Sequence, residues 1–269
     1  MKDKVVIITG ASSGIGKALA IEFAKKGSKV VLAARNPENL NSVLDEVKQY
    51  NAEAIAVVAD VSLVDDCGNL IKKTIETFGK IDILINNAGI SMRSMFLDTD
   101  LSVMHKLMDT NYWGTVNCTK FALPYLVEQK GSLVGIISIA GYLGLPARSA
   151  YSSSKYAIRG FLDTIRVEHL KSGLHVLVAA PGFTASNIRK VALLGDGSLQ
   201  GATPRQEEKM MTAEQVAKKI YRAIVKRKRT LILTFVEGKL AVFLSKWIPG
   251  LLDKLNYNHM AKEENSPLK

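Results

Sequence analysis

The sequence predicts an α/β fold in which a doubly wound, mostly parallel sheet of about seven strands carries helices on both faces. Short and almost continuously apolar runs alternate with longer amphipathic stretches, and a glycine-rich turn follows the first apolar run. Strands without polar alternation are typical of parallel sheets that are covered on both sides. Because crossovers between parallel strands are right-handed, the helices fall on both faces of such a sheet.

The elements follow from these runs in chain order. The predicted strands are 5–9, 29–34, 54–59, 81–86, 132–138, 175–180 and 230–233. The predicted helices are 15–26, 37–50, 63–78, 99–128, 149–171 and 212–226. No change of composition marks a second domain, so we interpret residues 1–269 as one domain. Residues 184–211 are rich in Gly, Ser, Thr and charged residues, and we expect a mobile substrate lid there.

Composition narrows the class of protein. Apolar residues make up 47% of the 269 residues, which is enough for a large core. Cys67 and Cys118 are far apart in sequence, and the four histidines are scattered, so we expect neither a disulfide framework nor a metal site. The first predicted strand begins at Val5 and leaves no room for a targeting peptide. We therefore expect a cytoplasmic protein.

The formal net charge of +11 is concentrated late in the chain, between Lys218 and Arg229. Such a run suits either the solvated end of a helix, where cations offset the helix dipole, or a surface for an anionic partner. The hypothesis of a nucleic-acid partner has no support other than this charge, and we expect no such partner.

The first strand leads into a turn that fits a dinucleotide phosphate site. Its sequence is Thr9-Gly10-Ala11-Ser12-Ser13-Gly14-Ile15-Gly16, placed between a strand and a helix. Glycines allow a tight turn and a close approach to a pyrophosphate, which the N-terminal amides of the helix can bind. We expect Gly10, Ser12, Ser13, Gly14, Ile15 and Gly16 to contact the cofactor.

The ends of the next strands suggest which dinucleotide binds. Strand two ends at Ala34, which has no carboxylate for the ribose hydroxyls, and Arg35 offers a guanidinium suited to a 2′-phosphate. This predicts NADP(H). Asp60, followed by Val61, either contacts the adenine or caps the next helix.

A further cofactor contact is expected after strand four. Asn87, Ala88 and Gly89 form a small-residue turn that would let the backbone pass close to the cofactor.

Two side chains of the predicted helix 149–171 suggest acid–base chemistry. Tyr151 and Lys155 lie four residues apart and so share a helical face. A nearby ammonium lowers the pKa of a phenol, whose ordinary value of about 10 is too high for a base at neutral pH. Ser138, at the end of strand five, can donate a hydrogen bond to a substrate oxygen.

Together these residues resemble the short-chain dehydrogenase/reductase family, which has a Rossmann fold. The similarity runs from Val5 to about Ile232. Its motifs, in chain order, are Thr9–Gly16, Asn86–Gly89, Asn111, Ser138, Tyr151–Lys155, Pro181-Gly182 and Thr184.

The resemblance implies a role for each catalytic residue. Tyr151 exchanges a proton with the substrate oxygen, and Ser138 orients and polarises that oxygen. Lys155 holds the nicotinamide ribose and lowers the pKa of Tyr151. Asn111 anchors a water in a proton relay, although a polar residue satisfied at a helix bend is the alternative.

The resemblance also completes the cofactor site. Thr184 and the backbone near Ile15, Asn87 and Phe183 would hold the phosphates and the carboxamide, and NADPH delivers the hydride. The expected set adds Tyr151, Lys155, Pro181 and Gly182 to the residues above. Related enzymes are commonly dimers or tetramers, so a homo-oligomer is expected.

The substrate side is predicted to be apolar. Residues expected to line it are Ile90, Met92, Ile139, Ala140, Tyr142, Leu143, Leu145 and Phe183. Segments 91–96 and 143–148 resemble the branch that contains hydroxysteroid dehydrogenases and membrane-associated member 7B-like reductases. This favours a hydrophobic, lipid- or steroid-like carbonyl substrate.

An apolar stripe in the C-terminal extension, about 236–257, has two interpretations. It packs on its own domain or on a partner subunit, with a bend near Pro249, or it contacts a membrane peripherally.

The leading hypothesis is therefore an NADP(H)-dependent carbonyl reductase or alcohol dehydrogenase. The rival is a narrow or inactive protein on the same fold that senses the cofactor or acts as a scaffold. The intact proton-handling set favours the enzyme.

Overall fold

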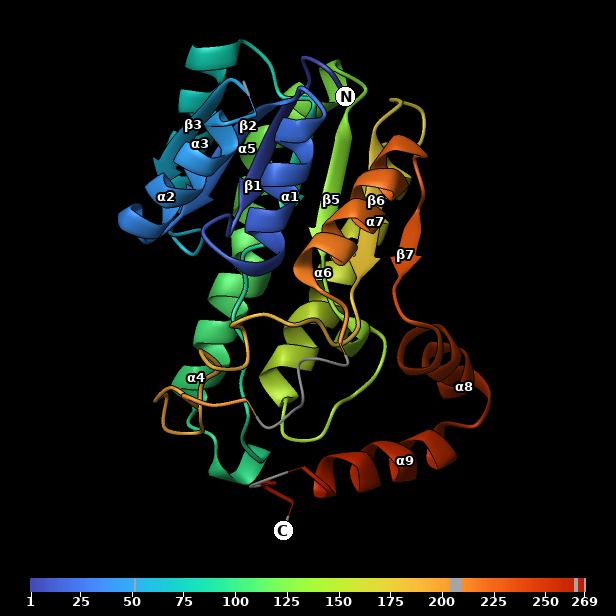
Figure 1. Cartoon of the computed structure of the whole chain (residues 1–269). Coiled ribbons are helices and arrows are strands. Elements are labelled where there is room, and N and C mark those ends of the chain that lie inside the picture. The colour runs from blue at the N-terminus through green and yellow to red at the C-terminus, as the bar shows by residue number, and fades with distance from the viewer. Residues whose placement is uncertain (51, 204–209, 264–265, 269) are drawn as a thin grey trace.

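The structure is a computed structural model that describes residues 1–50, 52–203, 210–263 and 266–268. One parallel sheet of seven strands forms its centre, in the order β3-β2-β1-β4-β5-β6-β7 (Figure 1). The strands are β1 (Val5–Thr9), β2 (Lys29–Ala34), β3 (Ala54–Val58), β4 (Ile83–Asn86), β5 (Ser132–Ile136), β6 (His175–Ala180) and β7 (Thr230–Ile232). This confirms the predicted fold class.

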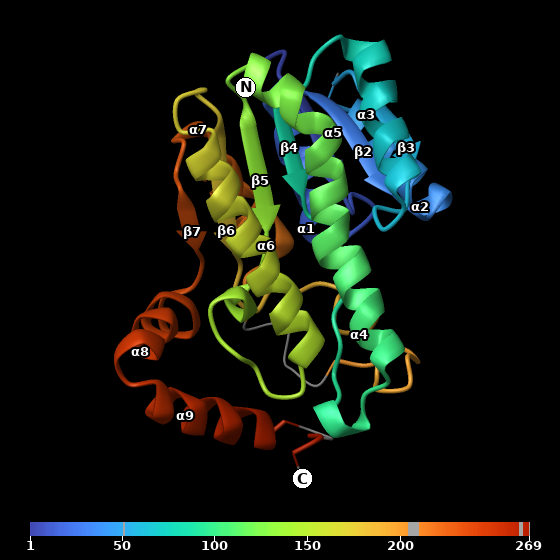
Figure 2. The same ribbon diagram turned by 180° about the vertical axis from the view of Figure 1, so that it is seen from behind.

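Helices cover both faces of the sheet. On one face lie α1 (Gly14–Lys25), α2 (Pro37–Lys48) and α7 (Ala213–Val225), which are in front in Figure 1. On the other lie α3 (Val64–Phe78), α5 (Gly114–Glu128) and α6 (Ser149–Glu168), which are in front in Figure 2. The alternating residues of β1 are divided between two apolar cores, with Val6 and Ile8 in one and Val5 and Ile7 in the other.

The prediction of one continuous α-helix over residues 99–128 is wrong. A short 3-10 turn, η1 (Phe96–Asp98), precedes α4 (Leu101–Leu107), and a π-helical segment, η2 (Met108–Trp113), separates α4 from α5. One extra residue in a helical turn leaves no mark in the hydrophobic pattern, because the apolar face resumes afterwards. Such segments occur frequently at functional sites.

Strand five is shorter than predicted for a local reason. The backbone N–H of Ile137 still donates to Ala179 on β6 (2.8 Å), but the ladder ends at Ile136. Ser138 then caps a 3-10 turn, η3 (Ile139–Gly141), by accepting a hydrogen bond from the Ala140 N–H (3.2 Å). The strand therefore delivers the Ser138 side chain to its carboxyl end.

The position of α6 depends on a glycine in β5. A Cβ at Gly135 would overlap the side chain of Leu162, which packs against the sheet with Ile158 and Ile165. Gly135 thus lets α6 lie close to β5. This contact sets the height of Tyr151 and Lys155 above the strand ends.

The predicted lid, 184–211, is tied to the domain at several points. The backbone of Leu193 exchanges hydrogen bonds with Ser91 and Arg93 (2.9 and 2.8 Å), and Thr184 forms a bridge with Met211. Residues 204–209 lie outside the described part of the chain. The remainder lies over the carboxyl ends of the strands, between α4 and α6 (Figure 1).

After β7 the chain forms a π-helical segment, η5 (Phe235–Leu240), then α8 (Ala241–Trp247) and α9 (Pro249–Ala261). The predicted bend at Pro249 therefore separates two helices. Val242 and Leu252 pack with Leu143 in a small cluster. Near the C-terminus, buried Glu263 forms an ion pair with buried Arg93 (3.2 Å).

The joint between β7 and η5 is tight. Thr234 has a φ of 64°, which is unusual for a β-branched residue. Its side chain lies so close to Gly182 and Gly238 that a Cβ on either glycine would lie 2.9 Å from the Thr234 Oγ1. The C-terminal segment therefore packs directly on the loop that follows β6.

Asp82 fastens the start of β4 to the start of β1. Its buried carboxylate accepts hydrogen bonds from the Lys4 Nζ (2.6 Å) and the Val5 N–H (2.9 Å), and Lys80 lies 3.1 Å away. Burial acts to raise the pKa of Asp82, but the hydrogen bonds from Lys4, Val5 and Lys80 outweigh it, and the pKa is lowered.

We expect Asp82→Asn to reduce the free energy of unfolding at pH 7 by about 1 to 3 kcal/mol, because a charged acceptor is lost. A lowered pKa gives stability that is present above the unfolded value and is lost as pH falls through the folded value. The difference from the native chain should therefore shrink in acid. Urea unfolding at several pH values checks this, with exposed Asp45→Asn as control; a pH-independent difference would contradict it.

Candidate active site

A cavity opens at the carboxyl ends of β4, β5 and β6. Its described lining includes residues from six separate predicted motifs and from the lid. They are Ile15, Asn87, Gly89, Ser91, Ile136, Ile137, Ser138, Ile139, Leu145, Arg148, Tyr151, Lys155, Pro181, Gly182, Phe183, Thr184, Ser186, Ile188 and Arg189. The fold thus brings predicted catalytic and cofactor residues to one place.

Ser138 and Tyr151 face each other across this cavity. Ser138 comes from the end of β5, and Tyr151 lies in the first turn of α6; their side chains are hydrogen-bonded. Burial raises the pKa of Tyr151, while the hydrogen bond with Ser138 and the positive charge of Arg148 act to lower it. The phenol is therefore protonated at neutral pH, as a proton donor must be.

Lys155 is buried one turn further along α6. Its ammonium donates to the carbonyl oxygen of Ile136 (3.0 Å) and lies 5.8 Å from the centre of the Tyr151 ring. Burial lowers the pKa of Lys155 to about 8. The charge that acts on Tyr151 in this structure comes from Arg148, which the sequence reasoning did not single out.

Asn111 lies fully buried at the centre of the π-helical segment η2. Its side chain accepts from the Ile90 N–H (2.8 Å) and donates to the Ile90 carbonyl oxygen (3.0 Å) and to the Ser154 Oγ (2.9 Å). A Cβ at Gly89 would lie 3.0 Å from its Oδ1 and 3.3 Å from the Lys155 Nζ. Asn111 thus fixes the loop after β4 beside Lys155.

The glycine-rich turn forms an open cradle at the start of α1. Gly10 and Gly14 have φ values of 64° and 52°, and a Cβ at Gly16 would overlap the carbonyl oxygen of Gly10. Ser13 caps the helix without a side-chain hydrogen bond, and the first turn contains no acidic residue. The N-terminal amides and the positive end of the helix dipole are thus suited to a phosphate.

The second turn braces the first. The hydroxyl of Thr9 accepts from the N–H groups of Asn87 and Ala88 (both 3.0 Å). The Asn87 amide donates to the carbonyl oxygens of Thr9 and Gly10 (2.9 and 3.2 Å). Thr9 belonged to the predicted motif but was given no role, and its hydroxyl joins the two turns.

Arg35 and Asp60 lie further along the edge, after β2 and β3. Their charged groups are 3.8 Å apart, and Arg35 is largely exposed. Asp60 accepts from the N–H and hydroxyl of Ser62 (3.0 and 2.7 Å), so it stabilises the turn that precedes α3. Val61 packs against Gly114, and its carbonyl oxygen accepts from Asn117 (3.3 Å).

The loop after β6 closes the other side of the cavity. Pro181, Gly182, Phe183 and Thr184 line it, and the Thr184 hydroxyl donates to the Gly182 carbonyl oxygen (3.1 Å). Buried Arg189 donates to the Thr184 carbonyl oxygen (3.1 Å), which holds the lid to this loop.

The apolar lining is only partly the predicted one. Ile139, Leu145 and Phe183 line the cavity. Met92 and Leu143 instead pack into two small hydrophobic clusters that adjoin the cavity through Tyr151 and Leu145. For a single apolar residue in a loop, the sequence does not indicate whether the side chain lines a cavity or packs into a hydrophobic cluster.

Sequence comparison decides the family. A profile of the family described as short chain dehydrogenase matches residues 4–194. The chain belongs to this family. It is 36% identical over 258 residues to Dehydrogenase/reductase SDR family member 7B of Xenopus tropicalis, covering 93% of this chain and 84% of the relative. It is 37% identical over 263 residues to Dehydrogenase/reductase SDR family protein 7-like of Dictyostelium discoideum, covering 95% and 81%.

Solved structures share the fold. A short chain dehydrogenase/reductase from Burkholderia phymatum in complex with NAD superposes with a TM-score of 0.77 at 25% identity, covering 86% of this chain and 88% of that one. An alcohol dehydrogenase from Thermococcus sibiricus complexed with 5-hydroxy-NADP gives 0.74 at 24%, covering 86% and 94%. The chain thus belongs to a family of oxidoreductases with a nucleotide-binding Rossmann fold.

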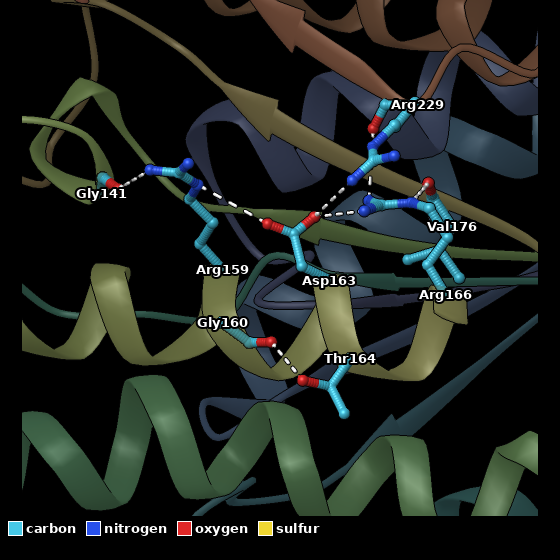
Figure 3. A network of polar contacts seen from close by, with 8 residues as sticks. All are labelled: Gly141, Arg159, Gly160, Asp163, Thr164, Arg166, Val176 and Arg229. Atoms are coloured by element: carbon cyan, nitrogen blue, oxygen red, sulfur yellow. Dashed lines mark hydrogen bonds and ion pairs between the residues drawn. The ribbon is translucent and has the colours of Figure 1, made fainter. Parts of the chain in front are cut away.

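A polar network connects α6, which carries Tyr151 and Lys155, with β6 and the residue before β7 (Figure 3). Asp163 sits among Arg159, Arg166 and Arg229, with Arg159 Nε and Arg229 at 3.7 and 3.9 Å. Arg166 donates to the Val176 carbonyl oxygen on β6 (3.2 Å).

Within this network, Arg159 alone of the three arginines reaches the turn after Ser138. It donates to the Gly141 carbonyl oxygen (3.4 Å), and its guanidinium lies 4.0 Å from the centre of the Tyr142 ring. Because Arg159 lies on the helix that carries Tyr151, it links this helix to the turn that follows Ser138.

If Tyr151 and Ser138 act in catalysis, we expect Arg159→Met to lower kcat about tenfold while leaving the affinity for the dinucleotide unchanged, because small misplacements of reacting groups are costly. Arg229→Met is the matched control, since Arg229 reaches Asp163 but not η3. Steady-state kinetics and fluorescence titration with NADPH check this. Equal losses of kcat in both variants would show that the network acts through general stability instead.

Proposed function

We propose that the chain is an NADP(H)-dependent oxidoreductase that interconverts a ketone or aldehyde and an alcohol, with Tyr151 as the acid/base. The observation that carries this is the convergence of Ser138, Tyr151 and Lys155 on one cavity that adjoins the glycine cradle. A protein that only senses or binds a dinucleotide has no need for this set of groups.

The residues present fit a dinucleotide. The N-terminal turn of α1, which has no acidic residue, suits the pyrophosphate. The loops at Asn87 and Phe183 line the space between this turn and Tyr151. The nicotinamide, when bound, supplies or accepts the hydride.

The chain's own groups control position and proton transfer. Ser138 would hold the substrate oxygen with the hydroxyl that now bonds Tyr151, and Tyr151 would give that oxygen its proton during reduction. Lys155, with a pKa of about 8, is mainly charged at neutral pH and would favour the phenolate left behind. Asn111 keeps the Gly89 backbone beside Lys155.

The choice of NADP(H) rests on the end of β2. Ala34 offers no carboxylate to a ribose, whereas exposed Arg35 carries a guanidinium that can pair with a 2′-phosphate. Asp60, at 3.8 Å, would orient that guanidinium.

A hydrophobic carbonyl compound is the substrate that best suits the lining. Ile139, Leu145, Phe183 and Ile188 surround the space beside Ser138 and Tyr151. A lipid- or steroid-like ketone would bury its apolar body against them.

We also propose a homo-oligomer. Large apolar residues are exposed on η2, α5 and α6: Trp113, Phe121, Tyr156 and Val167. Exposed apolar patches of this kind suit a contact with a second copy.

We expect Tyr151→Phe to reduce turnover about 10³-fold, because the proton donor is lost, while NADPH still binds. Consumption of NADPH across ketones and aldehydes of rising hydrophobicity measures it. Tyr156→Phe, an exposed tyrosine on the same helix, is the control. Substantial reductase activity in Tyr151→Phe would overturn the assignment.

Arg35→Ala should raise the KM for NADPH about tenfold and leave that for NADH unchanged, because only NADPH carries the phosphate that the guanidinium pairs with. Initial rates with each cofactor measure it, with exposed Lys48→Ala as control. An equal rise for both cofactors would mean that Arg35 only supports the local structure.

A further inference from the structure

The C-terminal helices expose a row of large apolar side chains. Phe235 and Val236 of η5 are 71% and 66% exposed, and Trp247 at the end of α8 is 73% exposed. The complete exposed set on these segments is Phe235, Val236, Leu240, Phe243, Trp247, Ile248, Leu251, Leu255 and Tyr257. We call it the C-terminal apolar face.

This face is distinct from the side of the helices that packs on the domain. Val242, Leu252 and Met260 are buried. Of the residues that form the predicted stripe, Leu252 packs on its own domain, and most of the others are exposed in the single chain. The rings of Phe243 and Trp247 lie side by side, with centres 6.3 Å apart, and exposed apolar side chains that gather on a folded chain mark interaction sites.

A basic groove adjoins the apolar face. It is lined by five cations from α7, from the connection between α7 and β7, and from η5: Lys219, Arg222, Lys226, Lys228 and Lys239. None of the residues described as lining it is acidic. Phe235 lines the groove and belongs to the apolar face, so the two surfaces are continuous.

The apolar face itself carries both signs of charge. Lys246 and Lys254 are exposed beside it, as are Glu237 and Asp253. The excess positive charge thus comes from the groove, on one flank of the apolar row.

We propose that the C-terminal apolar face and the basic groove together bind the surface of a negatively charged lipid bilayer. Exposed aromatic and aliphatic side chains enter the boundary between headgroups and acyl chains, and adjacent lysines attract anionic headgroups. Among the described residues no helix is long and apolar enough to cross a membrane. The helices therefore lie in the plane of the interface.

Charge favours a lipid surface over a second copy of the chain. A second copy of the chain carries the same basic groove and the same net charge of +11. Like charges facing each other across an interface oppose association. An anionic bilayer meets the same surface with the opposite sign.

The placement of α9 connects this surface with the active site. A groove between α9 and the start of α6 is lined by Leu145, Tyr156, Asp253 and Tyr257. Leu145 also lines the catalytic cavity. Figure 2 shows α9 running across the end of the molecule below α6. Docking would thus bring the mouth of the cavity close to the lipid surface.

The test is sedimentation of the full chain with vesicles of phosphatidylcholine, alone or mixed with an equal part of phosphatidylglycerol. We expect binding to the mixed vesicles and a loss of it in high salt. Lys219→Gln with Lys226→Gln should weaken binding about thirtyfold, and Trp247→Ser about tenfold. Lys48→Gln with Lys73→Gln, and Val64→Ser, are matched exposed controls and should bind like the native chain.

Trp247 supplies a second readout. In a Trp113→Phe background it is the remaining tryptophan of the two in the sequence, and its emission should shift to the blue on adding mixed vesicles. Absence of both binding and shift, with the circular dichroism and NADPH binding of the native chain, would overturn the proposal. So would a Trp247→Ser variant that binds vesicles normally but loses a dimer in analytical ultracentrifugation, because the face would then serve self-association.

Discussion

The constraint on which the structure depends is the burial of a parallel sheet on both faces. Because helices close both sides, the carboxyl edge of the strands is where polar chemistry can meet a ligand. The strand order runs outward from β1 in one direction and from β4 in the other. The segment that follows β1 and the segment that follows β4 therefore cross to opposite faces of the sheet. The glycine-rich turn and the loop at Asn87 flank the crevice that this reversal creates, and the Thr9 hydroxyl joins them.

Within that crevice, burial moves two neighbouring groups in opposite directions. It raises the pKa of Tyr151 and lowers that of Lys155, since each shift favours the neutral form. The phenol thereby keeps its proton, and the ammonium comes closer to releasing one. Opposed shifts in adjacent groups are a recurrent sign of acid–base function. Here they arise because α6 lies close to β5, where Gly135 has no side chain.

The fold and much of the candidate site could be predicted because their signals are local. The turn at Gly10–Gly16 and the pair Tyr151 and Lys155 lie within single elements, where spacing determines geometry. The contacts of Asn111 with Ile90 and Ser154 and the 3.4 Å approach of the Cys67 and Cys118 sulfurs depend on packing between elements. Such contacts join residues as many as 51 positions apart, and no local pattern encodes them.

The close approach of Thr234 to Gly182 ties the start of the C-terminal segment to the loop after β6, which lines the candidate cavity. A side chain at Gly182 would overlap Thr234, and one at Gly238 would overlap the Leu233 carbonyl oxygen, so neither position can take a larger residue without a shift. Phe183 follows Gly182 directly. Because this contact is so close, a displacement of η5 would also displace the wall of the cavity. The C-terminal helices are thus mechanically coupled to the candidate site, and fusing a rigid tag to them would disturb the shape of the cavity.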